Sequence, residues 1–258
     1  MASAIIGGLI KDGTPASSIM VVEPFADARQ RLQAQFGVRV LAEANASLAE
    51  ASLVIWAVKP QTFKEAAQQT RQFCANALHL SVAAGIRSDS IANWLGTQRV
   101  VRAMPNTPAL VGLGQTGLFA RTAVTPQDKT WVEQVVATTG ALLWVSDEPL
   151  LDAVTAISGS GPAYVFFFIE AMIEAGTKMG LTLEQAHQLA VGTFVGASEL
   201  ARSASEPPSV LRERVTSKGG TTYAAITSMQ EADMASLFET ALKAAQHRAK
   251  ELGDAFGT

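Results

Sequence analysis

The sequence predicts two domains of different class, an α/β domain over residues 1–147 and an all-helical domain over residues 148–258. In the first part, short apolar runs rich in β-branched residues alternate with helical stretches. After about Asp147 such runs vanish, and Ala, Leu, Met and Glu dominate. Apolar strands alternating with helices are typical of a parallel sheet covered on both faces, so we expect a Rossmann-like fold in the first part.

The strands of the α/β part are expected where β-rich runs occur, at 19–22, 53–58, 78–82, 100–104, 117–121 and 142–145. Helical periodicity predicts helices between several of them, at 26–36, 62–73, 88–95 and 126–138. Ser88 before Asp89 is expected to cap one helix, and Thr125-Pro126 gives a cap followed by proline at the first helical position. The second part predicts helices at 150–157, 162–179, 183–203, 210–216, 223–230 and 234–252.

The beginning of the chain differs from the usual order of a dinucleotide-binding unit. Such a unit opens with a strand and a glycine-rich turn before its first helix. Residues 1–12 already have the pattern of that helix, and Gly7-Gly8 lies inside it. We therefore expect the first strand and the glycine-rich loop to be lacking, which leaves two strands of the sheet with unpaired edges. The main phosphate site cannot be assigned to any residue of this sequence.

Composition narrows the possible functions. Apolar residues make up 48% and charged residues 17%, and the net charge is −3 with no basic stripe, so neither nucleic acid nor an anionic membrane is an expected partner. The longest apolar run, 164–173, is interrupted by Glu170 and is shorter than a bilayer span. Cys74 is alone, which fits a buried thiol in a reducing, cytoplasmic compartment. The three histidines have no metal-site spacing, so no metal is expected.

Three motifs follow successive predicted strands. In open α/β sheets ligands bind beyond the carboxyl ends of the strands, so these motifs are candidates for a nucleotide site. The residues concerned are Ala57, Val58, Lys59 and Pro60 after the first of these strands, Ala84 and Gly85 after the second, and Met104, Pro105, Asn106 and Thr107 after the third. Each motif taken alone is also explained as a strand end or a turn. Their occurrence at successive strand ends favours the functional interpretation.

A second kind of motif suits an anion. Ser217, Lys218, Gly219, Gly220, Thr221 and Thr222 form a Lys-Gly-Gly turn that leads directly into a predicted helix. Glycine N–H groups, the helix N-terminus and hydroxyls can together surround one carboxylate, while Lys218 adds charge or faces solvent. The stretch from Ser160 to Pro162 also starts a predicted helix, but simple capping explains it.

Glu23 ends a strand, and two interpretations of it are open. Its carboxylate either bonds the ribose of a nucleotide, which would favour NADH, or lies on the surface.

Five segments in this order resemble the pyrroline-5-carboxylate reductase family: AVKP, SVAAG, VRAMPNTPA, SGSGPAYVF and TSKGGTT. The similarity covers residues 1 to about 252, and VTSKGGTTYAAITSMQ is its most specific stretch. The resemblance implies reduction of 1-pyrroline-5-carboxylate to L-proline with NADPH, or NADH, by a Rossmann domain followed by a helical domain. It also implies a homodimer with interlocking helical domains, and association of dimers into a decamer in many members.

The resemblance also assigns roles to individual residues. It implies that Ser217, Gly219, Gly220 and Thr222 hold the substrate carboxylate, and that Thr155 and Ser158 lie near the imine. Residues implied to line the nicotinamide cofactor are Ala57, Lys59, Pro60, Gly85, Met104, Pro105, Asn106 and Thr107, with Asn45 at the adenosine ribose. The catalytic candidates are thus Thr155, Ser158 and Thr222. The departure from the family is at the start, where Met1-Ala2 corresponds to the end of the glycine-loop motif.

This chemistry explains why no strong base, nucleophile or metal cluster is needed. The ring nitrogen of the substrate can be protonated to an iminium, and hydride then reaches an already electrophilic carbon, so catalysis is mainly orientation. A Thr or Ser hydroxyl, or water, supplies the final proton.

Two other interpretations stay open. A β-hydroxyacid dehydrogenase shares the architecture but needs a lysine on the helix at 162–179, where Lys178 stands only at the far end. An inactive dimerising module is the other.

Overall fold

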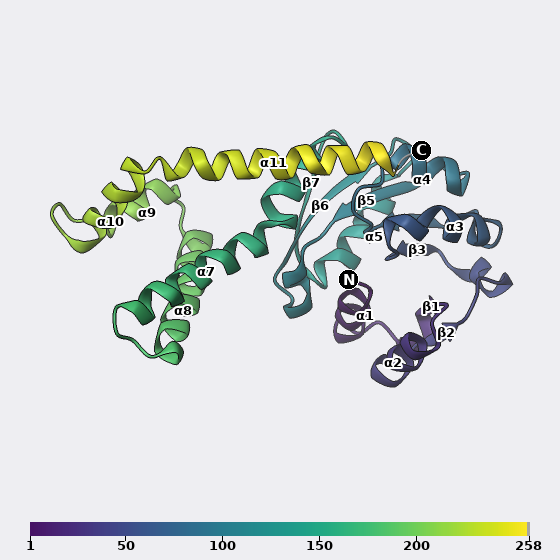
Figure 1. Cartoon of the computed structure of the whole chain (residues 1–258). Helices are drawn as coiled ribbons and strands as arrows, with labels where there is room; N and C mark the ends of the chain where they lie inside the picture. Colours follow the sequence, from purple (N-terminus) through teal and green to yellow (C-terminus); the bar gives the residue numbers. More distant parts are fainter. Residues whose placement is uncertain (257–258) are drawn as a thin grey trace. The chain divides into compact units, whose positions relative to one another are not determined.

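The computed structural model describes residues 1–256, and all but two of its strands form one sheet (Figure 1). The five-stranded sheet has the order β3 (Leu53–Trp56), β4 (Leu78–Ser81), β5 (Val100–Met104), β6 (Gly114–Ala120) and β7 (Gly140–Trp144). Strands β1 (Met20–Val22) and β2 (Arg39–Leu41) form a separate parallel pair. The predicted combination of a Rossmann-like part and an all-helical part is confirmed.

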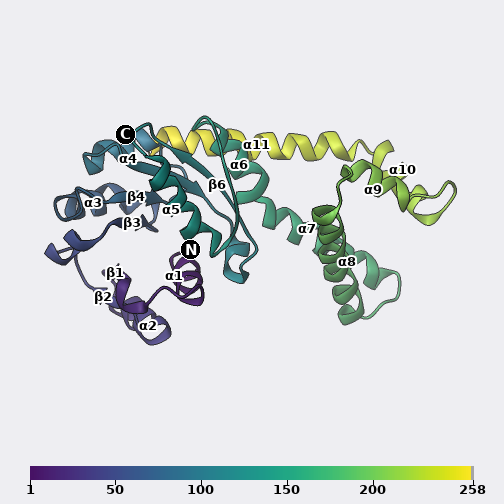
Figure 2. The ribbon, with the colours of Figure 1, turned by 180° about the vertical axis from the view of Figure 1, so that it is seen from behind.

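Both the two-stranded pair and the five-stranded sheet have unpaired edges. Strand β1 pairs only with β2, and β3 pairs only with β4. In Figures 1 and 2, which are opposite views, β1 is the member of the pair nearer to β3. These are the unpaired edges expected from a sequence that opens directly with a helix, α1 (Ala2–Lys11).

One predicted feature of the sheet is wrong. We expected parallel strands throughout, but β6 runs antiparallel to β5, while β7 runs parallel to β6. The physical reason is the short connection from Met104 to Gly114, which contains only the 3₁₀ turn η4 (Thr107–Val111). A parallel neighbour needs a crossover of a dozen or more residues, whereas an antiparallel one can follow a short loop.

Two apolar clusters cover the two faces of the sheet. On one face, Leu78, Leu80 and Val101 pack with Val132 and Val135 of α5 (Pro126–Ala137) and with Ile5 of α1. On the other, Trp56 and Val100 pack with Phe63 of α3 (Pro60–Thr70) and Ile91 of α4 (Ser88–Leu95). The alternation of side chains along a strand sends neighbouring residues such as Val100 and Val101 to opposite clusters. The helix α2 (Ala26–Phe36) follows β1.

All described elements after β7 are helical. They are α6 (Leu150–Val154), the π-helical turn η5 (Thr155–Gly159), α7 (Gly161–Lys178), α8 (Leu183–Ser203), α9 (Pro208–Arg214), α10 (Thr221–Glu231) and α11 (Met234–Ala255). Two compact units result: Met1–Pro162 together with the chain from Ala244 on, and Ala163–Lys243. The domain boundary predicted at 147/148 marks the change to helices and stays a prediction.

The second unit carries many exposed apolar side chains. Phe166 is 60% and Phe167 66% exposed on α7, and Leu189 and Val195 on α8 are similarly open. The helical run Leu150–Lys178 is also long and apolar enough to cross a bilayer by length and composition alone. The apolar run 164–173 lies within this longer helical stretch, which is made up of α6, η5 and α7.

Candidate active site

The three strand-end motifs lie at one edge of the sheet, as expected from parallel strands. Strands β3, β4 and β5 are parallel neighbours, so the segments that follow Trp56, Ser81 and Met104 leave the sheet on the same side. Exposed residues occur in each segment: Ala57 and Lys59, Ala84, and Thr107. Lys59 is the N-cap of α3 and Pro60 its first residue, which also gives this motif a structural role.

Gly85 has a backbone conformation that favours glycine. Its φ is +70°, in the left-handed region, and a Cβ there would lie 3.2 Å from Cβ of Leu252 near the end of α11. Ala84, its neighbour, is exposed. The C-terminal turns of α11 therefore pack against the strand-end loop within the first unit.

Two predicted ribose contacts belong to the segments that follow β1 and β2. The Glu23 carboxylate accepts a hydrogen bond from the backbone N–H of Phe25 at 2.9 Å. Arg29 donates to the main-chain carbonyls of Glu23 (2.8 Å) and Pro24 (2.7 Å), which holds a cation beside this strand end. The Asn45 side chain caps the 3₁₀ turn η2 (Ala46–Glu50) by accepting from the N–H of Ser47 at 3.0 Å.

The π-helical turn η5 carries two of the catalytic candidates. Thr155 Oγ1 donates to the carbonyl of Leu151 at 2.7 Å, and Ser158 Oγ donates to that of Val154 at 3.1 Å. Both hydroxyl protons are thus used inside the chain, which leaves the oxygen lone pairs free to accept. Ser160 donates its backbone N–H to Thr155, and the helix runs on into α7. α7 begins at Gly161, within the predicted start at Ser160–Pro162, but only Ser160 separates it from η5, so this start is not a free N-terminus.

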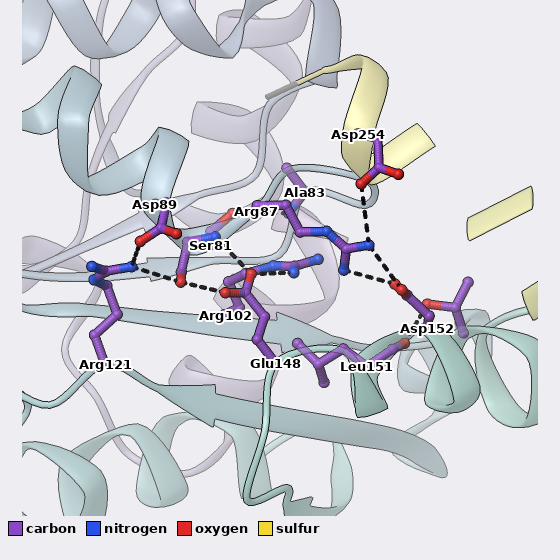
Figure 3. Close-up of polar contacts among 12 residues, drawn as sticks. Ser81, Ala83, Arg87, Asp89, Arg102, Arg121, Glu148, Leu151, Asp152 and Asp254 are labelled. Carbon is purple, nitrogen blue, oxygen red and sulfur yellow. Dashed lines mark hydrogen bonds and ion pairs between the residues drawn. The ribbon is translucent and has the colours of Figure 1, made fainter. Parts of the chain in front are cut away.

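A buried ion network holds α6 against the sheet (Figure 3). Arg102 in the middle of β5 pairs with Glu148 at 2.5 Å, and Glu148 also accepts from the N–H (2.6 Å) and hydroxyl (2.5 Å) of Ser88. Glu148 therefore caps α4, which corrects the predicted role of Ser88 as the side-chain cap. The pKa of Arg102 is lowered by burial, against the opposing attraction of Glu148.

Next to this pair, Arg87 forms an ion pair with a residue of α6. Its guanidinium donates two hydrogen bonds to Asp152, at 3.0 and 2.8 Å, and approaches Asp254 of α11 at 4.0 Å. The hydrogen bond to Asp152 raises the pKa of Arg87. Sequence reasoning missed this network, because Arg102 stands in an apolar run and its partners are distant in sequence. A charged residue inside a predicted buried strand was the available signal.

The anion site predicted at residues 217–222, called here the cradle, has the expected local form. Gly219 has φ +77°, the N–H of Gly220 closes a turn onto the carbonyl of Ser217 at 3.0 Å, and α10 begins at Thr221. Gly220 is the N-cap and offers no side chain, so the first N–H groups of α10 are not capped by one. A Cβ on Gly220 would lie 2.8 Å from Oγ of Ser217, so glycine lets this hydroxyl lie close to the helix end. Lys218 is exposed.

Three further kinds of chemical group do not form a site among residues 1–256: a metal cluster, the thiol of Cys74 and the imidazole of His79. No group of three or more His, Cys, Asp or Glu there could hold a metal ion. Cys74 is buried, and burial raises the pKa of its thiol, so it is a poor nucleophile. His79 is buried in the sheet and its pKa is lowered to about 4, mainly by burial.

Comparison with known proteins gives matches over the whole chain. Residues 148–252 match a family model described as pyrroline-5-carboxylate reductase dimerisation, and residues 1–85 match one described as NADP oxidoreductase coenzyme F420-dependent. A pyrroline-5-carboxylate reductase of Pseudomonas aeruginosa is 42% identical over 100% of this chain and 95% of its own length.

Solved structures agree with the sequence matches. A pyrroline-5-carboxylate reductase from Coxiella burnetii has a TM-score of 0.92 and 37% identity, covering 97% of this chain and 94% of that one. A Plasmodium falciparum pyrroline carboxylate reductase with NADP bound has a TM-score of 0.85 and 27% identity, with 97% and 94% coverage.

Proposed function

The chain belongs to the pyrroline-5-carboxylate reductase family, and on that premise we propose how its own residues serve the reaction. The chain is an oxidoreductase that reduces 1-pyrroline-5-carboxylate to L-proline by hydride transfer from NAD(P)H, the last step of proline biosynthesis. The resemblance expected from the sequence motifs is thereby confirmed.

The substrate carboxylate is bound by residues 217–222. Ser217 Oγ lies beside Gly220, and the first N–H groups of α10 have no side-chain cap, so both are available as donors; the hydroxyl of Thr222 in the first turn is proposed as a further donor. A helix N-terminus favours an anion through both its unpaired N–H groups and its dipole. The local geometry of this cradle is the single observation that carries the substrate assignment. Lys218 and Thr221, both exposed, complete the rim.

The nicotinamide cofactor supplies the hydride and lies along the strand ends. The residues proposed to hold it are Ala57, Val58, Lys59, Pro60, Ala84, Gly85, Met104, Pro105 and Thr107 along the main sheet, with Glu23 and Asn45 toward the ribose. They fit a flat dinucleotide, because small and exposed groups border the edge where β3, β4 and β5 end. Arg29 beside Glu23 supplies positive charge for a 2′-phosphate, in keeping with NADPH.

The hydroxyls of Thr155 and Ser158 act as acceptors. Each hydroxyl donates a hydrogen bond to a carbonyl one turn earlier, so its oxygen presents lone pairs to a donor. A protonated ring N–H of the substrate is a donor that matches them, which stabilises the iminium form before hydride transfer to carbon. After hydride transfer the nitrogen keeps that proton as a secondary amine, and water supplies the final proton that gives the ammonium group of L-proline.

The exposed apolar surface of the helical unit is proposed as a subunit interface. The family model for dimerisation spans residues 148–252, which include Phe166, Phe167 and Leu189. Obligate dimer interfaces are apolar, and exposed apolar patches mark such sites, so the length and hydropathy of Leu150–Lys178 suit burial between subunits. Association of dimers into a decamer, and action in the cytoplasm, complete the proposal; buried Cys74 fits a reducing compartment.

A substrate comparison tests this function. Purified protein should oxidise NADPH with pyrroline-5-carboxylate and should not reduce NADP⁺ with small β-hydroxyacids. The competing dehydrogenase chemistry needs a lysine at a carbonyl, and Lys178 is instead paired with Glu174 at 2.5 Å on the surface. Turnover of hydroxyacids without turnover of the imine would contradict the proposal.

A further inference from the structure

Asn106 connects three separate segments of the first unit. It stands two residues after the end of β5 and is 7% exposed, and both the nitrogen and the oxygen of its amide form hydrogen bonds. Its Nδ2 donates to the carbonyl of Ser158 in η5 at 3.1 Å. Its Oδ1 accepts from the backbone N–H of Gln115 in β6 at 2.8 Å. A buried amide with both polar ends satisfied fixes the segments that it joins.

The segment that Asn106 reaches is an unusual one. A π-helical turn is rare, and such turns occur often at functional sites, because they displace side chains from regular helical positions. Here the turn carries Thr155 and Ser158. A Cβ added to Gly159 would lie 2.5 Å from Cε of Met104, so the end of β5 also packs against the turn. Val154, just before it, packs on Gly117 of β6.

We propose that Asn106 is a positioning residue that holds η5, and with it the hydroxyls of Thr155 and Ser158, in register with the end of β5. Its hydrogen bond goes to the backbone carbonyl of Ser158, so Asn106 fixes the position of the turn itself. An amide suits this position because one group must donate and the other must accept. Each amide group makes one hydrogen bond within the chain, so Asn106 holds together the backbone segments that meet at this edge.

The catalytic consequence rests on the proposed function. A displacement of about 1 Å in a positioning group can lower a rate on the order of a hundredfold. Loss of the hydrogen bond from Asn106 to Ser158 should therefore lower kcat, since the substrate carboxylate is bound elsewhere. The KM for NADPH should change little, because the backbone of the strand ends stays in place.

Two substitutions separate the two hydrogen bonds. Asn106→Ala removes both, whereas Asn106→Asp keeps an acceptor for the N–H of Gln115 and loses the donor to Ser158. We expect both variants to lose roughly 10- to 100-fold in kcat, with KM for NADPH within about twofold of wild type. Hydrogen exchange of the apo protein should become faster in a peptide covering residues 154–161. Asn93→Ala, an exposed asparagine on α4, is the matched control and should change neither readout.

The outcomes decide the proposal. A wild-type kcat in Asn106→Asp, with loss only in Asn106→Ala, would show that the bond to Gln115 is the one that matters and would overturn it. Unchanged exchange at residues 154–161 in Asn106→Asp would overturn it as well. If Asn106→Ala does not fold, Asn106→Asp carries the test alone. Absence of imine reduction by the wild-type protein would contradict the proposed function, while the exchange result would still decide the positioning role.

Discussion

Arg87 and Asp152 form a largely buried, two-point ion pair, with guanidinium nitrogens 3.0 and 2.8 Å from the two carboxylate oxygens. The pair joins the loop before α4 to α6 (Figure 3). Because α6 leads directly into η5, this pair fixes the helix from which the catalytic candidates Thr155 and Ser158 extend.

Removal of the carboxylate at Asp152 should destabilise the protein. Asp152→Ala leaves the guanidinium of Arg87 with reduced compensation in a mostly buried place, and breaking a buried pair costs about 3 kcal/mol. Urea unfolding would measure the loss. Asp254→Ala is the matched control, because Asp254 approaches the same Arg87 at 4.0 Å but has a side chain that is 65% exposed. Its unfolding midpoint should stay close to wild type. Equal effects of the two variants would contradict this assignment.

Acid should weaken the fold through His79. Its Nδ1 accepts from the indole N–H of Trp56 at 3.0 Å, and its pKa in the folded state is lowered to about 4, mainly by burial, from an ordinary value near 6.5. The unfolded chain therefore binds the proton first. The stabilising effect of the neutral ring is complete above about pH 6.5 and is lost as the pH falls toward 4, in total about 3 kcal/mol.

A pair of histidine variants isolates this effect. Unfolding free energies measured from pH 7 to pH 4 should fall more steeply for the wild type than for His79→Gln, which cannot titrate. His187→Gln, at an exposed position, should follow the wild-type curve. Parallel curves for wild type and His79→Gln would show that this ring does not drive the acid sensitivity.

A charge on the exposed face of α7 should weaken association. Phe167 is 66% exposed, so Phe167→Asp should leave the folded subunit intact but place a carboxylate in the apolar interface. Sedimentation velocity at micromolar concentration should show a shift toward monomer. Phe25→Asp changes an equally exposed phenylalanine (73%) in the first unit and should leave the dimer unchanged. Dissociation by Phe25→Asp and not by Phe167→Asp would place the interface elsewhere.

The elements that the sequence predicted well are those with strong local signals. Helices 26–36, 88–95 and 183–203 agree with the structure in both bounds, and the capping box of Thr125 with Asp128 confirms the predicted start of α5. Strand β2, only Arg39 to Leu41, was missed because Arg39 interrupts its apolar residues, whereas the equally short β1 lies in a continuous apolar run. The clustering of the strand ends followed from parallel pairing alone.

The features that were not predicted depend on contacts between distant residues. The direction of β6 depends on a loop, the cap of α4 comes from Glu148, 60 residues after Ser88, and the two-sided role of Asn106 needs both Gln115 and Ser158. The π-helical form of η5 also has no local sequence signal. Tertiary packing decides these features, and periodicity does not report it.

The Michaelis constant of Thr222→Ala for pyrroline-5-carboxylate tests the central claim, that the turn before α10 binds the substrate carboxylate. A hydrogen bond to a charged group contributes about 1.5–3 kcal/mol, so KM should rise roughly tenfold or more, while KM for NADPH stays within about twofold. Thr130→Ala, an exposed threonine on α5, is the control and should leave both constants unchanged. A rise in KM for the imine of no more than twofold in Thr222→Ala would contradict the carboxylate site.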